Sequence, residues 1–438
     1  MKVLMFGWEF PPHISGGLGT ASYGLTKGIA QQNVEVLFVM PKASGDEDSS
    51  IGKIINASDV EMPATISNTE TFWENVDFLP VDSGLIPYLG LEKYELMQRE
   101  TTQNKSHSFI HLGKKYSFSG KYGANLMEEV MRYALVASKI AKEQEFDIIH
   151  AHDWLTYLAG IVAKRISGKP LIVHVHATEF DRSGENVNRV VYDLEKQGME
   201  KANAVITVSN LTKNIVTLRY GIDKDKVFTI HNAVDFSGRE EIEDTGTNEE
   251  KTKEPPKKEK VITFLGRITF QKGPEYFIEA ANKVLKLYPN VRFVMAGSGD
   301  MMDKMVKRVA QLRIGTKFTF TGFLTGDDVN KMYAESDIYV MPSVSEPFGI
   351  SPLEAMRTGV PVIISEQSGV AEVLKNAVKV NFWDVDALAD AIYGLLAYPV
   401  LSNNLKEKGM REVNSLSWYD KAKLVKDLYQ TVLNQNSQ

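Results

Sequence analysis

The feature that most constrains the fold is an alternation of short apolar, β-branched runs with segments of helical periodicity. The first part of the chain contains the runs KVLMF, VEVLFVM, FDIIHAH, PLIVHVH, NAVITVS and KVFTIHN, and helical patterns such as 125–143 and 187–201 separate them. Strands that are apolar on both faces and joined by helices form a parallel sheet covered on both sides. The sequence therefore predicts an α/β chain with a doubly wound parallel sheet.

A charged stretch interrupts this alternation near the middle of the chain. Residues 238–260 read GREEIEDTGTNEEKTKEPPKKEK, in which Ile242 is the only apolar side chain apart from the prolines. A segment of this composition cannot bury enough apolar surface to offset the entropy lost on ordering, so it predicts an exposed connection. The alternation then resumes with VITFLG, VRFVMAG, KFTFTGF, IYVMPS and PVIIS.

Chain length agrees with a division into two domains. A chain of 438 residues is too long for one ordinary core, and two domains of roughly 200 residues are expected. We predict a Rossmann-like domain at 1–237, a charged linker at 238–260 and a second Rossmann-like domain at 261–416. The irregular, aromatic-rich stretch 41–125 is expected to form an elaborated loop region over a cleft. Residues 417–438 predict an amphipathic helix. Its apolar face carries Trp418, Ala422, Val425, Leu428 and Val432.

The composition excludes several classes of function. The net charge of −6 gives no general reason to bind nucleic acid or an anionic bilayer, so an anion site has to be local. The sequence contains no cysteine, which excludes disulfides, zinc–thiolate sites and thiol catalysis. The start MKVLMFGWEFPP lacks the long apolar region of a signal peptide, and no apolar stretch reaches the ~20 residues of a membrane span. We therefore expect a cytoplasmic protein without a transmembrane segment.

A glycine-rich turn follows the first predicted strand. In WEFPPHISGGLGTASYG, Gly16, Gly17 and Gly19 allow the backbone to approach a ligand closely before a helix begins near Thr20. A dinucleotide fingerprint requires a third glycine, which is missing, and an acidic residue at the end of the second strand, where Met40 stands. The turn therefore disfavours an NAD-dependent oxidoreductase.

Histidines gather at two strand ends of the first predicted domain. HAHDW contains His150 and His152, and HVHATEFDR contains His174 and His176. His150 and His174 lie inside apolar runs and are interpreted as structural residues. His152 and His176 fall where each strand ends and the polar crevice is expected to begin. Because no carboxylate lies at a familiar ligand spacing from them, a metal site is disfavoured.

The sharpest signal lies in the second predicted domain. SVSEPFGISPLEAMRTGVPVI carries Glu346 on a loop and Glu354 in the first turn of a helix, and GRITFQKG carries Arg267 and Lys272 after the first strand. Carboxylates accept hydrogen bonds from hydroxyls, a helix N-terminus favours an anion, and the two cations can neutralise a diphosphate leaving group. Because loops at the carboxyl ends of parallel strands form the ligand crevice, these four residues predict a site for a sugar nucleotide.

The order of these motifs resembles that of a known enzyme family. SGGLG, HDW, HATEFDR, KVFTIHNAVD, GRITFQKG and EPFGISPLEA, with SW opening the closing helix, resemble the retaining glycosyltransferases of the GT-B type over essentially the whole chain. GWEFPP, GGLGTASYGLTKGIA and HDW resemble the glycogen and starch synthases. The resemblance implies two Rossmann-like α/β domains facing across a cleft, with the closing helix crossing back to the first domain. It also implies a nucleotide diphosphate sugar as donor, an oligo- or polysaccharide acceptor, and neither a cofactor nor a metal.

The resemblance assigns roles to individual residues. Arg267 and Lys272 would hold the donor diphosphate, and Glu354 would bind the nucleotide ribose. Glu346 would face the hydroxyls of the donor sugar beside the reacting carbon, and His176 would contact that sugar from the other domain. The other residues assigned to donor or sugar binding are Gly16, Gly17, His152, Asp153, Phe348, Gly349 and Ile350.

One departure from the family pattern bears on the donor. Many bacterial glycogen synthases have a lysine two residues before the glycine pair, whereas this chain has Ile14, so one contact associated with ADP-glucose is absent. The first hypothesis is transfer of glucose from a nucleotide diphosphate glucose to the non-reducing end of an α-1,4-glucan. The alternatives are a glucosyl- or mannosyltransferase acting on a small sugar, a sugar phosphate or a lipid-linked sugar, a sugar-nucleotide epimerase, and a non-catalytic glucan-binding protein. The nucleobase, the sugar, the acceptor and the oligomeric state stay open.

Overall fold

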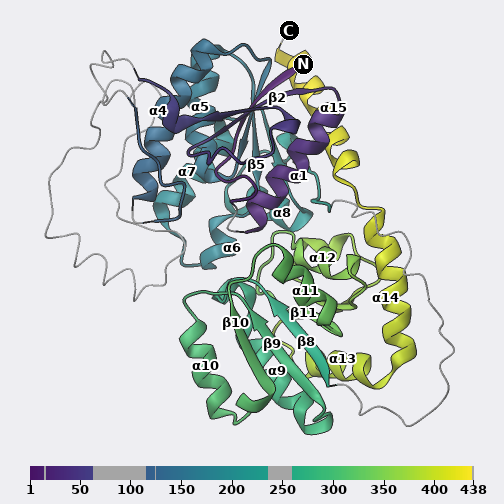
Figure 1. Ribbon diagram of the computed structural model, residues 1–438. Helices are drawn as coiled ribbons and strands as arrows, with labels where there is room; N and C mark the ends of the chain where they lie inside the picture. Colours follow the sequence, from purple (N-terminus) through teal and green to yellow (C-terminus); the bar gives the residue numbers. More distant parts are fainter. Residues whose placement is uncertain (14–15, 63–114, 124, 235–258, 437–438) are drawn as a thin grey trace, which may run out of the picture. The chain divides into compact units, whose positions relative to one another are not determined.

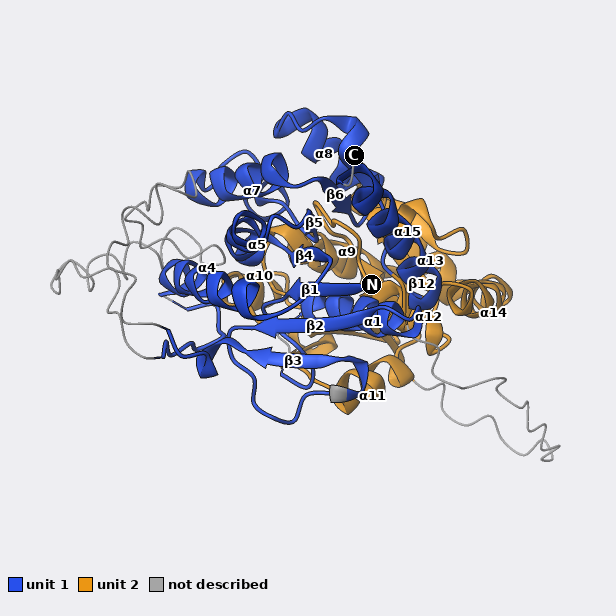
Figure 2. Cartoon of the chain, turned by 90° about the horizontal axis from the view of Figure 1, so that it is seen from above, with its two compact units in different colours: residues 1–232, 418–438 blue, residues 233–417 orange. Residues whose placement is uncertain are grey.

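The computed structural model in Figure 1 describes residues 1–13, 16–62, 115–123, 125–234 and 259–436. The chain forms two compact units, coloured separately in Figure 2: unit 1 comprises Met1–Asn232 and Trp418–Gln438, and unit 2 comprises Ala233–Ser417. Each unit contains a parallel sheet with helices, which confirms the predicted fold class of two doubly wound sheets. Most of the predicted linker 238–260 and most of the stretch 41–125 lie outside the described residues.

The sheet of unit 1 has seven parallel strands within the described part of the chain, in the order β3-β2-β1-β4-β5-β6-β7. The order reverses between β1 and β4, which is the point where an open sheet binds ligands beyond the carboxyl ends of its strands. The strands are β1 (Lys2–Phe6), β2 (Glu35–Met40), β3 (Lys53–Asn56), β4 (Ile148–His152), β5 (Leu171–Val175), β6 (Ala204–Thr207) and β7 (Val227–Thr229).

The helices of unit 1 cover both faces of its sheet. Helix α5 packs against α4 and α7, and α15 packs against α1. Right-handed crossovers place α1 on the face opposite to α4, α5 and α7. The helices are α1 (Gly17–Gln31), α4 (Leu126–Glu143), α5 (Trp154–Ser167), α6 (Glu179–Ser183), α7 (Arg189–Lys201), α8 (Asn210–Arg219) and α15 (Trp418–Asn436), with short 3-10 turns at Ser49–Ile51, Ala57–Asp59 and Lys224–Lys226.

The contact between α1 and α15 depends on glycine. A Cβ atom on Gly24 would lie 2.2 Å from Nε1 of Trp418, and one on Gly28 would lie 2.6 Å from the Trp418 carbonyl oxygen. Larger side chains at these positions would therefore push the two helices apart. The five apolar residues predicted on one face of α15 are all buried.

Alternate residues of β4 and β5 point to opposite faces of the sheet. Ile149, Ala151 and Val173 belong to the core beneath α4 and α5. His150 points the other way and contacts the hydroxyl of Tyr429 in α15. The histidines predicted near these strand ends therefore lie on the face that α15 covers.

The sheet of unit 2 repeats this topology. Its described strands are six, all parallel, in the order β10-β9-β8-β11-β12-β13, with the reversal between β8 and β11. The strands are β8 (Lys260–Leu265), β9 (Val291–Ala296), β10 (Phe318–Gly322), β11 (Ile338–Met341), β12 (Val362–Ser365) and β13 (Val378–Val380). The helices are α9 (Pro274–Leu287), α10 (Met302–Gln311), α11 (Asp327–Glu335), α12 (Ser351–Arg357), α13 (Val385–Ala397) and α14 (Pro399–Asn414), with 3-10 turns η4 (Phe270–Lys272), η5 (Gly315–Lys317) and η6 (Gly369–Glu372).

No single helix in the described ranges is long and apolar enough to cross a bilayer. The helices α13 and α14 reach the required length and hydropathy only as a pair, across a bend of 97°. Helix α13 packs against α9, and Leu388 and Ile392 of α13 are fully buried in the core of unit 2.

Candidate active site

The two predicted cations of unit 2 lie on the loop that follows β8. Arg267 comes two residues after the end of β8 at Leu265, its side chain is exposed, and its Nη2 donates to Oε1 of Gln271 at 3.4 Å. Lys272 ends the turn η4. The carbonyl oxygen of Gln271 accepts from the Val344 N–H at 2.9 Å. This bond ties the cationic loop to the loop that follows the neighbouring strand β11.

Lys272 and Glu346 form an ion pair. The strands β8 and β11 are neighbours, so the loop after β11 carries Glu346 to the Lys272 ammonium, whose Nζ contacts Oε2 of Glu346. The Ser343 hydroxyl donates to the same oxygen at 3.2 Å. Glu346 is only 6% exposed, and a carboxylate at that burial requires such partners because leaving it unpaired is costly. The structure thus joins two of the predicted site residues that lie far apart in the sequence.

The segment after Glu346 turns sharply at Gly349. Gly349 has φ +97°, and a Cβ atom there would lie 3.0 Å from Cε of Met341 and 3.1 Å from Cγ of Glu346. Glycine is the residue that adopts this backbone conformation without strain. Phe348 is buried, and its carbonyl oxygen accepts from the Val370 N–H at 2.7 Å. Ile350, partly exposed, is the last residue before α12, so this turn sets the direction of that helix.

Glu354 lies in the first turn of α12, as predicted. The Tyr333 hydroxyl lies 3.4 Å from its Oε2, and burial raises the pKa of the Glu354 carboxyl group. The Tyr339 hydroxyl contacts Oγ of Ser351 at 2.8 Å and the carbonyl oxygen of Leu265 at 3.2 Å. The N-terminus of α12 is therefore tied to the end of β8. The loops that carry Arg267, Lys272 and Glu346, and the first turn of α12 that carries Glu354, adjoin the carboxyl ends of β8 and β11.

Gly16 and Gly17 lie at the start of α1 in unit 1. Both are exposed, and a Cβ atom at either position would meet no atom within 4 Å. The backbone there is open to close approach, as the sequence predicted. The helix begins at Gly17, earlier than the expected start near Thr20. Glycine is tolerated there because the first turn of a helix makes no intrahelical hydrogen bonds through its N–H groups.

Four imidazole rings form a stack at the ends of β4 and β5. The ring centroids of His150 and His152 are 4.4 Å apart with 14° between the planes, and those of His174 and His176 are 4.3 Å apart with 19° between the planes. Nδ1 of His152 lies 3.0 Å from Nε2 of His176. Burial lowers the pKa of all four imidazoles, to about 3 for His150 and His176. The whole stack is therefore neutral near pH 7.

The burial of these histidines corrects one expectation. His150 and His174 are buried as predicted, but His152 is 0% exposed and does not face a crevice. Its register partner is His174 of β5, and its ring is hydrogen-bonded to His176. His176, which follows β5, is the partly exposed member of the stack. His152 can therefore act on a substrate only through the His176 ring.

Three of the stacked histidines are close enough together to be considered as metal ligands. The possible ligand nitrogens of His150, His152 and His174 lie within 4.8 Å of one another. The rings are nearly parallel, so the nitrogen lone pairs lie in separate parallel planes and do not converge on one ion. Nδ1 of His150 and of His152 have hydrogen-bond partners in Tyr429 and His176, whereas Nε2 of both rings and both nitrogens of His174 have none among the described atoms. The stacking of the rings, rather than their hydrogen bonds, therefore argues against a metal centre.

Asp153, the residue after β4, has an unusual backbone conformation. Its φ of 63° and ψ of 165° lie in a region that is essentially restricted to glycine. Its N–H donates to the His174 carbonyl oxygen at 2.9 Å, and its Oδ1 accepts from the Trp154 N–H at 2.7 Å. Such conformations persist only where the surroundings hold them, and they cluster at functional sites. Asp153 caps α5 and stays a candidate site residue.

Comparison with known families decides the class of the protein. Residues 2–229, more than half of the chain, match the family model for the starch synthase catalytic domain. Residues 246–412 match the model for glycosyl transferases group 1. The chain belongs to the glycogen/starch synthase-like GT-B glycosyltransferases.

Several proteins are similar to this glycosyltransferase over nearly their whole length. An uncharacterized glycosyltransferase of Methanocaldococcus jannaschii is 30% identical over 402 residues, which cover 90% of this chain and 87% of the relative. A glycogen synthase of Mycobacterium tuberculosis is 23% identical over 98% of this chain and 94% of its own. The solved structure of a sucrose-phosphate synthase from Thermosynechococcus elongatus matches with a TM-score of 0.70 at 19% identity and covers 99% of both chains.

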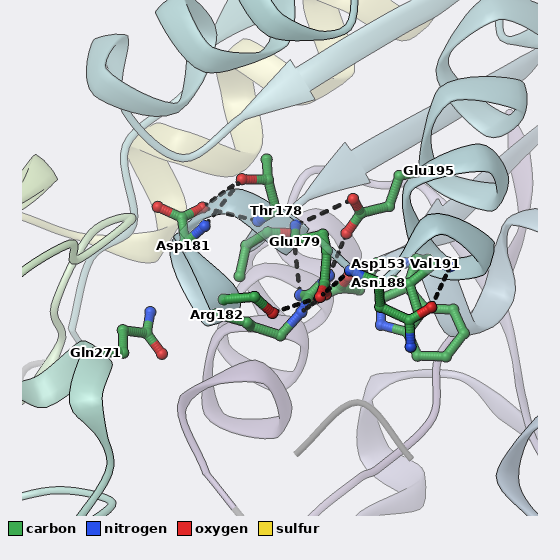
Figure 3. A network of polar contacts seen from close by, with 12 residues as sticks. Asp153, Thr178, Glu179, Asp181, Arg182, Asn188, Val191, Glu195 and Gln271 are labelled. Carbon is green, nitrogen blue, oxygen red and sulfur yellow. Dashed lines mark hydrogen bonds and ion pairs between the residues drawn. The ribbon is translucent and has the colours of Figure 1, made fainter. Parts of the chain in front are cut away.

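The sequence did not reveal a buried group of charged side chains in unit 1 of the glycosyltransferase. Figure 3 shows a buried network in which Arg182 contacts Glu179 and Glu195. The motif HATEFDR places Glu179 and Arg182 three residues apart, a spacing that joins side chains on one helix face. Glu195 lies on another helix, so its contact with Arg182 could not be read from spacing.

Proposed function

We propose that this glycosyltransferase is a retaining hexosyltransferase that moves glucose from a nucleotide diphosphate glucose to the non-reducing end of an α-1,4-glucan. The observation that carries the proposal is the Lys272–Glu346 pair at the adjoining ends of β8 and β11. It sets an ammonium that can neutralise a diphosphate beside a carboxylate that can accept hydrogen bonds from sugar hydroxyls. The similarity to a glycogen synthase supports the choice of glucose and glucan.

Lys272 can bind the donor without leaving Glu346. An ammonium group has three protons, so one can stay on the Glu346 carboxylate while another is donated to a phosphate oxygen. The bond between the anomeric carbon and the diphosphate oxygen breaks with its electron pair on the oxygen. Lys272 and the exposed Arg267 stabilise the negative charge that develops there. These cations supply what a divalent metal supplies in other phosphate chemistry, so we propose that transfer requires no metal.

The remaining assigned residues fit the same reaction. In a retaining transfer, the acceptor hydroxyl attacks the anomeric carbon from the face that the diphosphate leaves. As the new carbon–oxygen bond forms, the acceptor hydroxyl gives its proton to the departing diphosphate oxygen, which has taken the electron pair of the broken bond. We propose that Glu346 and His176 hydrogen-bond the donor sugar and that Glu354 hydrogen-bonds the ribose. His176 is neutral, as its lowered pKa requires, and its Nε2 is hydrogen-bonded to Nδ1 of His152, so its Nδ1 can make one hydrogen bond to the sugar.

The direct test is a transfer assay with purified protein. Labelled UDP-glucose and ADP-glucose are each supplied with and without glycogen, in the presence of EDTA. We expect label in precipitable glucan that an α-1,4-specific amylase releases, and nucleotide diphosphate release only when glycogen is present. The preferred nucleotide identifies the base.

Other outcomes of the same assay identify the alternatives. Label transferred to a sugar phosphate or to a lipid extract, with none in glucan, would favour the small-acceptor or lipid-linked transferase. Conversion of the donor sugar without any acceptor would favour an epimerase. Glycogen binding without nucleotide release, for every donor tested, would leave a non-catalytic glucan-binding protein.

A further inference from the structure

The segment that follows His176 is held by buried charged side chains. Nη1 of Arg182 lies 3.5 Å from the carbonyl oxygen of Ala177, the residue directly after His176. Two residues further on, the N–H of Glu179 donates to Oε2 of Glu195 at 3.0 Å. The backbone is therefore fixed on both sides of Thr178.

Thr178 itself is held by Asp181 in a capping box. Oδ2 of Asp181 accepts from the N–H and from the hydroxyl of Thr178, both at 2.8 Å. The two residues between His176 and α6, and the first residue of α6, are thus fixed one by one, and little freedom remains for the backbone that carries the His176 ring.

Glu179, Arg182 and Glu195 form a buried cluster, hereafter the brace (Figure 3). Nε of Arg182 donates to Oε2 of Glu179 at 3.0 Å, and its Nη2 contacts Oε1 of Glu195. The Tyr220 hydroxyl donates to the other oxygen of Glu195. The three charged side chains are only 1–3% exposed. The brace therefore joins α6, α7 and the end of α8.

The brace is better explained by its effect on the position of α6 than by a contribution to the stability of the fold. Helix α6 has five residues, too few to be stable by itself, so its position depends on these contacts. A buried ion pair usually adds little net stability compared with apolar side chains of similar volume. Its hydrogen bonds are directional, however, and they fix the groups that they join.

We propose that the brace is a positioning device that sets the His176 ring against the donor sugar, while His152 sets the ring from the other side. This inference rests on the proposed function, in which His176 contacts that sugar. A misplacement of about 1 Å can cost a hundredfold in rate, so loss of the brace is expected to act mainly on turnover. Glu179, Arg182 and Glu195 are then positioning residues, because they act through His176.

The ionisation of Glu195 gives a second test of the brace, through the pH dependence of kcat. Burial, assisted by Asp153, raises the pKa of Glu195 to about 8 against the opposing effect of Arg182 and the hydrogen bond from Tyr220. Its other charged neighbour is Glu179, and Tyr157 of α5 also senses its charge. The groups bonded to Glu195, which are Arg182 Nη2, the Tyr220 hydroxyl and the Glu179 N–H, are all donors, so only the ionised carboxylate can accept from all of them. The brace is therefore completed as the pH rises through 8, and we expect kcat to rise over this range.

The decisive experiment is a double-mutant cycle between the brace and His176, followed by glucan transfer. Arg182→Lys keeps the positive charge but removes the fork of donors. We expect it to lower kcat by roughly 10–100-fold with a much smaller change in the donor KM. In the His176→Ala background, Arg182→Lys should cause no further loss. Glu195→Gln should remove the rise in kcat through pH 8.

Matched controls distinguish a misplaced His176 ring from a general loss of structure. Glu185→Gln removes an ion pair with Arg219 whose side chains are 79% and 42% exposed, and it should leave kcat unchanged. If Arg182→Lys does not fold, Tyr220→Phe replaces it in the cycle, because it removes one hydrogen bond to Glu195 and no charge.

Two results would overturn the inference while the wild type transfers sugar normally. One is a folded Arg182→Lys protein with the parental kcat. The other is a double variant in which the separate losses multiply, since independent effects combine in that way. A wild type that transfers no sugar would instead refute the proposed function, and this inference with it.

Discussion

Lys272 neutralises a carboxylate that burial would otherwise destabilise. Its side chain is 21% exposed and that of Glu346 is 8% exposed, so the pair is open to solvent on the lysine side. Removing one partner of a fully buried pair costs about 3–5 kcal/mol, and partial exposure reduces that figure. The pair therefore contributes to the fold of the loop as well as to the proposed chemistry, and a mutational test has to separate the two.

Lys272→Ala is expected to lower kcat at saturating donor by at least about a hundredfold, because the leaving diphosphate loses an electrostatic partner. Steady-state transfer kinetics on protein that retains its far-ultraviolet circular dichroism provide the measurement. Lys283→Ala is the matched control, because it removes an exposed pair with Asp386 in the same unit, and it should leave kcat unchanged. Parental turnover in folded Lys272→Ala would remove this lysine from the mechanism.

The segments that carry the cations and carboxylates could be predicted from the sequence, because apolar runs show where strands end. Contacts that depend on which helices lie side by side could not be predicted. The ion pair between Arg182 and Glu195, and the hydrogen bond from Tyr220, join three separate segments. The burial of His152 was also missed, since it depends on β5 and the His176 ring lying beside the last residue of β4.

The histidine stack follows from the alternation of side chains between the two faces of strands β4 and β5. Residues two apart on a strand point to the same face, so the motif HAH places both its histidines on one face, and HVH does the same on the adjacent strand. The sequence shows each pair, but the pairing of the strands brings the two together. Burying four neutral imidazoles makes the stability of this sheet sensitive to acid.

The pH dependence of unit 1 follows from the lowered histidine pKa values. The unfolded imidazoles bind protons near pH 6.5 and the folded ones only near 3 for His150 and His176, so between these values the unfolded chain binds more protons. Stability is therefore complete above pH 6.5 and is lost as the pH falls, by up to ~1.4 kcal/mol per pH unit for each such histidine.

His174→Met tests this reasoning with little other disturbance, because neither ring nitrogen of His174 has a hydrogen-bond partner among the described atoms. The variant should match or exceed the parent in stability at pH 7 and lose less stability between pH 6 and pH 4. Hydrogen exchange of peptides from β4 and β5 reports on this unit alone. His13→Met, which replaces a 56% exposed histidine, is the control. An unchanged acid response in His174→Met would contradict the assignment.

Unit 1 is built from two separate parts of the sequence. The chain first forms the sheet of unit 1, then forms unit 2, and then returns to unit 1 as α15. This last helix buries Trp418, Val425, Leu428, Tyr429 and Val432. Burying one large apolar side chain contributes about 1.5–3 kcal/mol. Their sum is comparable to the total stability of a typical domain, roughly 5–15 kcal/mol. Unit 1 therefore depends on residues that follow unit 2 in the sequence.

Truncation after Ser417 should consequently unfold unit 1 and spare unit 2. Hydrogen exchange followed by mass spectrometry should show loss of protection in β1, β4 and β5, with protection retained in β8 and β11. Truncation after Leu433 is the matched control, because Asn434, Gln435 and Asn436 are exposed and the buried face stays intact. Retained protection of β1 in the longer truncation would mean that α15 is dispensable for unit 1. Equal loss in both sheets would mean that the two units unfold as one.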